Sequence, residues 1–198
     1  MLIKCTIAGD APILCNRFSD AAAEQTSAGT SSAVRSGSKG TPRDQATPKL
    51  YLDGQGHPVI PGPNIFRAII DAGRFHKMGK SQITTNKSSL VPAGITLVDL
   101  DVPLIVDGKP AVWEVDSRSV VIPATGGRVM CHRPRFDRWS LTFTLEVDPK
   151  MFDETLVRKL VDDAGAKIGL GDFRPARKGP FGRFKVTLWK NEVLKVAA

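Results

Sequence analysis

The sequence predicts an α+β fold with a ferredoxin-like, RRM-like βαββαβ core and long insertions. The first observation behind this prediction is the order of the segments along the chain, which is strand, helix, several strands, helix, glycine-rich loop and strand. The second is that two insertions interrupt this order, a segment of different composition at residues 17–48 and a hairpin-rich segment at residues 81–138. We expect the 198 residues to form a single domain around that core.

The first half of the chain is expected to supply one strand and one helix of the core. Residues 1–16 are typical of a strand that is interrupted at residues 9–12. Residues 49–53 predict a further short strand. Residues 63–73 place apolar side chains at spacings of three and four, which predicts an amphipathic helix.

The second half is expected to supply the remaining strands and the second helix. Residues 81–138 contain short apolar or alternating runs separated by turn signals, which predicts a β-hairpin-rich insertion. Apolar and polar residues alternate over residues 139–147, which predicts a core strand. An apolar stripe predicts a helix over residues 153–168, and residues 183–189 predict the closing strand.

Residues 17–48 differ from the rest of the chain in composition. They are rich in Ser, Ala, Gly and Thr, contain almost no large apolar residue, and carry the cations Arg17, Arg35, Lys39 and Arg43. Such a segment cannot bury enough apolar surface to fold alone. We therefore expect a flexible basic insertion.

The composition favours a polyanionic partner. Lys and Arg total 28 against 20 acidic residues, which gives a net charge of +8, and basic proteins of this kind commonly bind nucleic acid. No run approaches the ~18 apolar residues of a membrane span, so no membrane partner is expected. The three cysteines are isolated and have no metal-ligand spacing. This pattern favours the reducing cytoplasm, without disulfides, and predicts neither a metal site nor a cofactor.

The most informative segment is residues 169–185, which we call the glycine-rich loop. Its sequence is Gly-Leu-Gly-Asp-Phe-Arg-Pro-Ala-Arg-Lys-Gly-Pro-Phe-Gly-Arg-Phe-Lys, with four glycines among five cations. Free N–H groups of such a loop can form a concave anion site, and its cations suit phosphate oxygens. An ordinary helix-to-strand connection with solvated cations is the alternative.

A second motif makes a family resemblance visible. Residues 54–67 read Gly-Gln-Gly-His-Pro-Val-Ile-Pro-Gly-Pro-Asn-Ile-Phe-Arg. This segment resembles the Pro-Gly motif that opens the first helix of CRISPR-associated backbone subunits, which belong to the repeat-associated mysterious protein (RAMP) superfamily. Residues 169–185 are similar to the C-terminal glycine-rich loop of that superfamily. The two motifs occur in the family's order, and the chain as a whole resembles a distant or phage-encoded relative.

The resemblance implies an RNA-binding subunit of a CRISPR-like ribonucleoprotein. Such a subunit would bind single-stranded guide RNA through its phosphates and would stack head-to-tail with copies of itself and with other effector subunits. The residues expected to contact RNA are Arg17, Arg43, Gly62, Asn64, Arg67, Arg128, Arg133, Arg135, Gly169, Gly171, Arg174, Arg177, Lys178, Gly179, Gly182 and Arg183. Three aromatic side chains, those of Phe136, Trp139 and Phe181, are further candidates for stacking on bases.

Two other functions stay open at this point. Pro63-Asn64 replaces the usual Ser-Ser of the family motif, so the chain departs from the pattern at the start of the helix. An endoribonuclease of the same superfamily would use Asp44 or His132 as its working group. A phage or mobile-element protein could instead use the fold to bind single-stranded nucleic acid or to inhibit an effector complex. No acid–base pair or nucleophile spacing supports catalysis, so we expect binding without cleavage.

Overall fold

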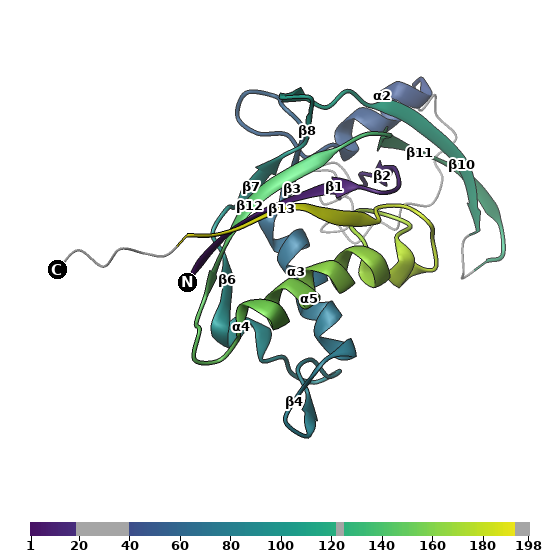
Figure 1. Cartoon of the computed structure of the whole chain (residues 1–198). Helices are drawn as coiled ribbons and strands as arrows, with labels where there is room; N and C mark the ends of the chain where they lie inside the picture. Colours follow the sequence, from purple (N-terminus) through teal and green to yellow (C-terminus); the bar gives the residue numbers. More distant parts are fainter. Residues whose placement is uncertain (19–39, 122–124, 193–198) are drawn as a thin grey trace.

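The computed structural model describes residues 1–18, 40–121 and 125–192. The mixed α+β character expected from the sequence is confirmed, because antiparallel sheets and helices alternate along the chain (Figure 1). The largest sheet lies at the centre of the molecule. The helices α3 (Gly62–Ala72) and α5 (Glu154–Asp163) lie together beside it.

The first strand of the chain is the middle of this sheet. Strand β1 (Leu2–Gly9) pairs antiparallel with β12 (Ser140–Val147) on one side and with β13 (Phe184–Glu192) on the other. Strand β6 (Ile95–Leu97) pairs with the far end of β12, so the spatial order is β13-β1-β12-β6. Segments from both ends of the chain therefore meet in one sheet.

Alternation along these strands divides the sheet into a buried and an open face. Ile3, Cys5 and Ile7 of β1 are fully buried, and their partners in β12 are also buried. They join the apolar stripes of the two helices in one core, for example Ile65 and Leu160. Burial of these side chains supplies the main favourable term for folding.

The open face of the sheet is mostly polar. Lys4 and Thr6 of β1 point outward beside Thr142 of β12, and the hydroxyl oxygens of the two threonines lie 2.9 Å apart. Lys4 lies directly opposite Lys190 of β13, and both side chains are exposed. Alternation of polar and apolar residues in the sequence accounts for this division.

Helix α5 continues into a wider turn before the glycine-rich loop. The side chain of Asp153 accepts a hydrogen bond of 2.8 Å from the Leu156 amide and so caps α5. The π-helical segment η3 (Ala164–Ile168) then ends at Gly169, whose φ is +75°. Helix 153–168 is thus confirmed as a helical segment, with a change of helix type at its C-terminal end.

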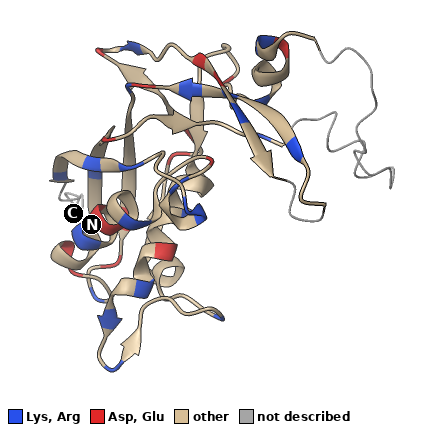
Figure 2. Cartoon of the chain, turned by 90° about the vertical axis from the view of Figure 1, so that its right-hand side faces the viewer, with Lys and Arg blue, Asp and Glu red and all other residues tan. Residues whose placement is uncertain are grey.

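A long β-hairpin projects from the body of the molecule (Figures 1 and 2). It consists of β10 (Glu114–Val121) and β11 (Arg128–Phe136), and β2 (Ile13–Leu14) pairs with the base of β11. This hairpin lies within residues 81–138, where the sequence predicts short strands and turns, and Arg128, Arg133 and Arg135 lie on its strand β11.

The remaining elements are short. Strand β3 pairs with β7, β4 with β5, and β8 with both β9 and β12. Their bounds, with those of the short helices, are α2 (Pro42–Ala46), η1 (Thr47–Lys49), β3 (Val59–Pro61), η2 (Gly73–Phe75), β4 (Lys77–Met78), β5 (Ser81–Gln82), α4 (Val91–Gly94), β7 (Asp101–Pro103), β8 (Ile105–Val106), β9 (Lys109–Pro110) and η4 (Pro175–Arg177).

The expected flexible insertion at 17–48 needs correction at its C-terminal end. Residues 42–46 form α2, which Thr41 and Asp44 stabilise through a capping box, a pattern that the sequence reading overlooked. Residues 19–39 of this insertion lie outside the described residues, including Arg35 and Lys39. The expected strand at 49–53 is reduced to an isolated bridge between Leu52 and Pro58.

Candidate nucleic-acid interface

The two sequence motifs meet at one groove. Its cavity volume is about 240 Å³, and it lies between the first turns of α3, the segment after β2 and the glycine-rich loop. Five of the residues expected to contact RNA line it: Asn64, Arg67, Gly169, Gly171 and Arg174. They come from segments about a hundred residues apart in the sequence. We refer to this cavity as the groove.

The helical repeat of α3 places Asn64, Arg67 and Ala68 on the wall of the groove. The Arg67 side chain is 67% exposed, and its Nε lies 3.1 Å from Asp71 Oδ1. The Asp71 side chain is only 12% exposed, so the arginine end alone of this ion pair meets solvent. Arg67 can therefore exchange this partner for a phosphate, because Arg74 also contacts the Asp71 carboxylate at 3.3 Å.

The opposite wall carries the second cation of the groove. Arg174 is half-buried, and its Nη1 donates a hydrogen bond of 2.9 Å to the carbonyl oxygen of Gly171. This bond uses one of the five N–H donors of the guanidinium and leaves the others for a ligand. Arg67 and Arg174 thus contribute two cationic side chains to the lining of the groove, one from α3 and one from the glycine-rich loop.

Many amides of the glycine-rich loop donate to protein acceptors, where an anion cradle was expected. Leu170 N donates to Gly182 O at 2.9 Å, Asp172 N to Leu14 O at 2.8 Å, and Gly182 N to Pro12 O at 2.7 Å. The amides of Gly169 and Gly179 also donate within the protein. The loop consequently offers a ligand its side chains more than its backbone.

The glycines of the loop serve close backbone packing. A Cβ at Gly182 would lie 1.8 Å from Leu170 O, one at Gly179 would lie 1.8 Å from Phe173 O, and one at Gly171 would lie 2.4 Å from Leu14 O. Gly169, Gly171 and Gly182 also have positive φ. These positions need glycine whether or not a ligand is bound.

Gly62 likewise has an internal partner. Its N–H donates to Leu100 O at 2.6 Å, and a Cβ on Gly62 would meet Asp99 O at 2.1 Å. We expected this amide to meet a phosphate at the start of the helix. The structure instead uses it to join α3 to the strand region that precedes β7.

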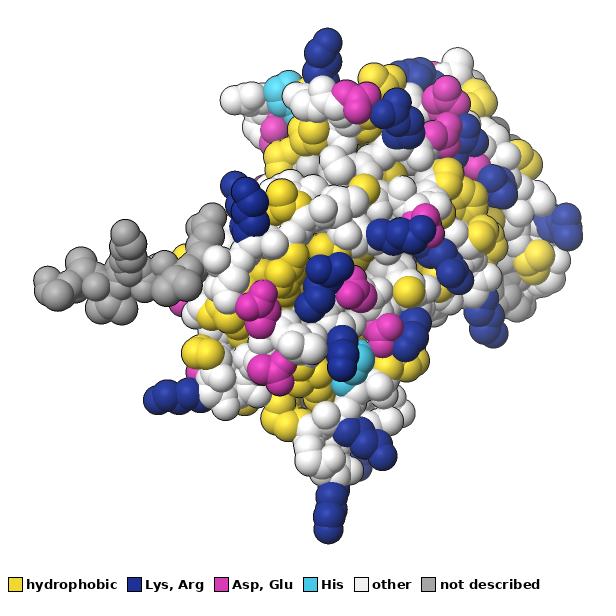
Figure 3. Space-filling view, in the orientation of Figure 1, with side chains coloured by type: hydrophobic (Ala, Val, Ile, Leu, Met, Phe, Trp, Pro, Cys, Tyr) yellow, Lys and Arg dark blue, Asp and Glu magenta, His cyan; other side chains and the backbone are white. Residues whose placement is uncertain are grey.

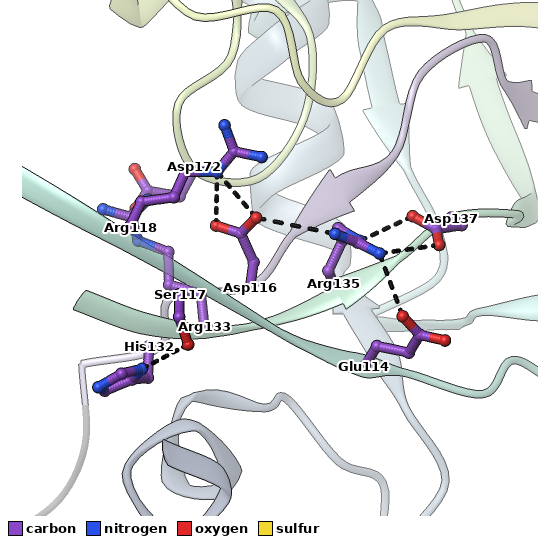
Figure 4. A network of polar contacts seen from close by, with 9 residues as sticks. All are labelled: Glu114, Asp116, Ser117, Arg118, His132, Arg133, Arg135, Asp137 and Asp172. Carbon is purple, nitrogen blue, oxygen red and sulfur yellow. Dashed lines mark hydrogen bonds and ion pairs between the residues drawn. The ribbon is translucent and has the colours of Figure 1, made fainter. Parts of the chain in front are cut away.

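Several other expected RNA contacts are held by protein groups. Arg133 is buried beside Asp172, at 2.9 Å between Nε and Oδ2. Arg135 contacts Glu114 at 3.1 Å and Asp137 at 2.8 Å, and the hydrogen bond to Asp137 raises its pKa. These two arginines are drawn in Figure 4 within a network of carboxylates. Neither faces the groove.

The remaining predicted cations lie outside the groove. The Arg43 guanidinium lies 4.1 Å from the centre of the Trp113 ring, and Arg128 donates to Ser119 Oγ at 3.4 Å. Arg183 lines a separate hollow beside α5. Arg177 and Lys178 are exposed on and after η4, and no ion pair holds them within the described residues.

A second hollow lies next to the groove and extends it. Its volume is about 410 Å³, Arg17 and Leu52 line it, and Tyr51 lines both cavities. Asn16 also lines the groove. Neither Tyr51 nor Asn16 was predicted from the sequence as a residue of the site. Tyr51 lies in a segment that was read as a strand, and no motif marks Asn16.

The aromatic candidates for base stacking belong to the core instead. Phe136 is fully buried, Trp139 is 3% exposed and Phe181 is 6% exposed. Trp139 Nε1 donates to Ala11 O at 2.9 Å. These rings are therefore unavailable to a ligand in this conformation.

On the face drawn in Figure 3, charge is spread among the described residues, and cationic side chains lie beside carboxylates. Figure 2 shows cations along the projecting hairpin as well as on the body. Attraction of a polyanion is consequently a property of many separate sites.

The two candidate catalytic groups have structural partners. The Asp44 carboxylate accepts hydrogen bonds from the Thr41 hydroxyl at 2.7 Å and the Thr41 amide at 2.8 Å, which lower its pKa. His132 Nδ1 lies 2.7 Å from Ser117 Oγ on the hairpin. Neither residue lines the groove.

Within residues 1–18, 40–121 and 125–192 no group of three or more His, Cys, Asp or Glu side chains is placed to hold a metal ion. Cys5 and Cys15 are buried and Cys131 is half-buried, and all three are free thiols. Among the described helices, none has the length and apolarity needed to cross a bilayer.

Comparisons with known proteins support the fold. No family model matches the sequence, and no curated protein matches it. A chain in the cryo-EM structure of the type III-B Cmr-β complex bound to cognate target RNA is similar in structure, with a TM-score of 0.54 and 10% sequence identity. The similarity covers 96% of this chain and 59% of that chain. At this identity the match establishes a shared fold, to a chain of a CRISPR effector complex.

Proposed function

We propose that this protein is an RNA-binding subunit of a CRISPR-like ribonucleoprotein and that it binds single-stranded guide RNA at the groove. The observation that carries the proposal is the convergence of two motifs on one cavity. Asn64 and Arg67 from the Pro-Gly motif line the same cavity as Arg174 from the glycine-rich loop. The similarity to a chain of an RNA-bound effector complex is the independent support.

The strand order supports a ferredoxin-like core. The elements β1, α3, β6, β12, α5 and β13 follow one another as βαββαβ. Their spatial order β13-β1-β12-β6 corresponds to 4-1-3-2 in that numbering. We propose that the other elements, including the hairpin, are insertions into this core. Stacking of neighbouring copies along the RNA belongs to the same proposal.

The chemistry of the groove favours contacts to phosphate and sugar. Guanidinium groups on two walls suit phosphate oxygens, which occur regularly along any strand. Binding is then largely independent of sequence and decreases steeply with salt, because each neutralised phosphate releases counterions. Asn64 and Tyr51 add an amide and an aromatic ring beside the two cations.

We propose binding without cleavage. The Asp44 carboxylate caps α2, and His132 contacts Ser117, so neither is placed at the groove beside the proposed RNA. A metal-independent nuclease would need an acid–base pair close to the scissile phosphate. No observation favours the phage or mobile-element alternative over the effector subunit.

The test is the affinity of the purified protein for labelled single-stranded RNA over a salt series. We expect tight binding at low salt and a linear fall of log K with log salt. The double variant Arg67→Ala with Arg174→Ala should lower the slope by about 1.4, from a contribution of ~0.7 per phosphate contact on a single strand. The bound RNA should stay intact on a denaturing gel.

A matched control removes the same charge elsewhere. Lys77 and Lys80 lie in and beside the β4–β5 hairpin, beyond the far end of α3 (Figure 1). Lys77→Ala with Lys80→Ala should leave the slope close to the wild-type value. If the salt slope decreases equally in the two double variants, the groove is not the RNA-binding site. Failure of the wild type to bind RNA at low salt would refute the proposed function itself.

A further inference from the structure

One buried arginine contacts the glycine-rich loop from the projecting hairpin. The Arg133 side chain is only 9% exposed, and its Nε lies 2.9 Å from Asp172 Oδ2. The Nε–H group of Arg133 donates no hydrogen bond to a protein acceptor, so its contact with Asp172 is an ion pair without a hydrogen bond at this atom. A buried guanidinium that points into the protein cannot also meet a phosphate in solvent.

The carboxylate of Asp172 joins three parts of the chain. Besides Arg133 of β11, it accepts a hydrogen bond of 3.0 Å from Asn16 Nδ2, in the segment after β2. The amide of Asp172 donates to Leu14 O at 2.8 Å. Asp172 therefore fixes the loop to both the hairpin and β2.

The same residue determines the place of Arg174. Asp172 and Arg174 both line the groove, and Arg174 Nη1 is bonded to Gly171 O. Phe173, between them, has φ of +49° and donates its amide to Asp172 Oδ1 at 2.8 Å. A residue other than glycine adopts this left-handed backbone conformation only where its surroundings hold it there. The Asp172 carboxylate is part of those surroundings.

A second contact joins the hairpin to the loop. The Arg118 guanidinium lies 4.8 Å from the centre of the Phe181 ring, and Arg118 Nε lies 2.8 Å from Asp116 Oδ1. Phe181 in turn packs against Phe173, with ring centres 6.1 Å apart. Figure 4 shows these hairpin residues gathered where the loop passes the two strands.

We infer that the Arg133–Asp172 ion pair positions the glycine-rich loop, and with it Arg174, against the groove. Arg133 is then a positioning residue and not a phosphate contact, in contrast to the expectation from the sequence. The hairpin and the groove wall are joined through the buried Arg133 guanidinium, so displacement of the hairpin base changes the groove. The RNA part of this inference rests on the proposed function, whereas the positioning of the loop does not.

The first measurement tests the loop without RNA. Trypsin cleaves after exposed lysine and arginine, and Lys178 in the loop supplies such a site, with Lys80 of the β4–β5 turn as an internal reference. Asp172→Asn keeps the shape of the side chain and removes its charge. We expect the ratio of the cleavage rate at Lys178 to that at Lys80 to be ~10-fold higher in the variant than in the wild type, because the loop opens more often.

The second measurement separates positioning from phosphate contact. Asp172→Asn and Arg133→Met should each weaken RNA binding by ~10-fold while the salt slope stays at the wild-type value. Loss of a direct phosphate contact would lower that slope by ~0.7. Arg67→Ala, which removes a cation of the groove that lies outside the loop, is the control for a change in slope without a change in cleavage.

A double variant that replaces both partners of the ion pair allows the test to proceed if a single variant unfolds. Leaving one buried charge unpaired is strongly destabilising, whereas replacing both partners by apolar residues is commonly tolerated. If circular dichroism shows that Asp172→Asn is unfolded, Arg133→Met with Asp172→Leu replaces it in both measurements. Unchanged cleavage at Lys178 in the folded variants would overturn the inference, as would a lower slope for Arg133→Met. If the wild type does not bind RNA, the proposed function fails and the cleavage result still decides the positioning.

Discussion

Substitution of Gly182 by alanine tests whether the loop glycines serve the fold or the ligand. Gly182 has φ of +69°, and a Cβ on it would lie 1.8 Å from Leu170 O. The clash is with backbone, so no side-chain rotation relieves it. The Gly182–Leu170 backbone pair must separate, which removes the hydrogen bond from Leu170 N to Gly182 O and disturbs that from Gly182 N to Pro12 O.

The expected loss of stability follows from these contacts. A left-handed conformation costs alanine about 1–2 kcal/mol, and each lost backbone hydrogen bond costs about 1 kcal/mol. The lower entropy of the unfolded alanine chain offsets this by roughly 0.4–1 kcal/mol. The net destabilisation is about 2–4 kcal/mol, which for a chain of this size lowers Tm by about 4–16 °C.

Thermal unfolding followed by circular dichroism measures this shift. Gly54→Ala is the matched control, because no heavy atom lies within 4 Å of a Cβ at that position, and we expect its Tm to change little. The reasoning would be refuted by a Gly182→Ala variant with the Tm of the wild type and weaker RNA binding. Such a result would mean that this glycine admits the ligand and has no role in packing.

Three further predictions concern the thiols, the candidate catalytic groups and the capping of α2. Burial raises the pKa of Cys5 and of Cys15 to about 12, so at pH 8 a thiol reagent should label Cys131 alone in the native protein and all three cysteines in denaturant. Because the unfolded thiols ionise near pH 9.0, the stabilisation from their burial is complete below that pH. It should be lost between pH 9 and about 12, which a series of Tm values tests. Asp44→Asn and His132→Ala should leave the yield of RNA fragments at the wild-type background, and fragments that vanish in either variant would indicate a nuclease. Thr41→Ala should destabilise α2 by about 0.5–2 kcal/mol, measured as faster amide hydrogen exchange at Gln45 than in the wild type.

Most of the central sheet could be predicted from local patterns. Strands β1 and β12 alternate apolar and polar residues, and α3 and α5 repeat apolar residues at helical spacing. Where each pattern faces one core, periodicity alone identifies the element. The β10–β11 hairpin was harder to predict because polar and charged residues fill both faces of much of it.

The groove was predicted in part. The two motifs identified Asn64, Arg67 and Arg174, because glycine and proline mark the backbone turns that bring them to one site. Tyr51 and Asn16 could not be found, since their role depends on which segments meet in three dimensions. Arg133 was misjudged for a related reason. A cation in a basic stretch is expected in solvent, and only the fold shows that Asp172 lies beside it.

The open face of the central sheet affects the tendency of the protein to self-associate at high concentration. Exposed sheet faces with large apolar side chains tend to self-associate. Here the threonine hydroxyls of Thr6 and Thr142 and the ammonium groups of Lys4 and Lys190 meet the solvent. Two copies that approached through this face would bring like charges together and would have to remove water from the hydroxyls. This face is consequently less prone to self-association than an apolar sheet face of the same size.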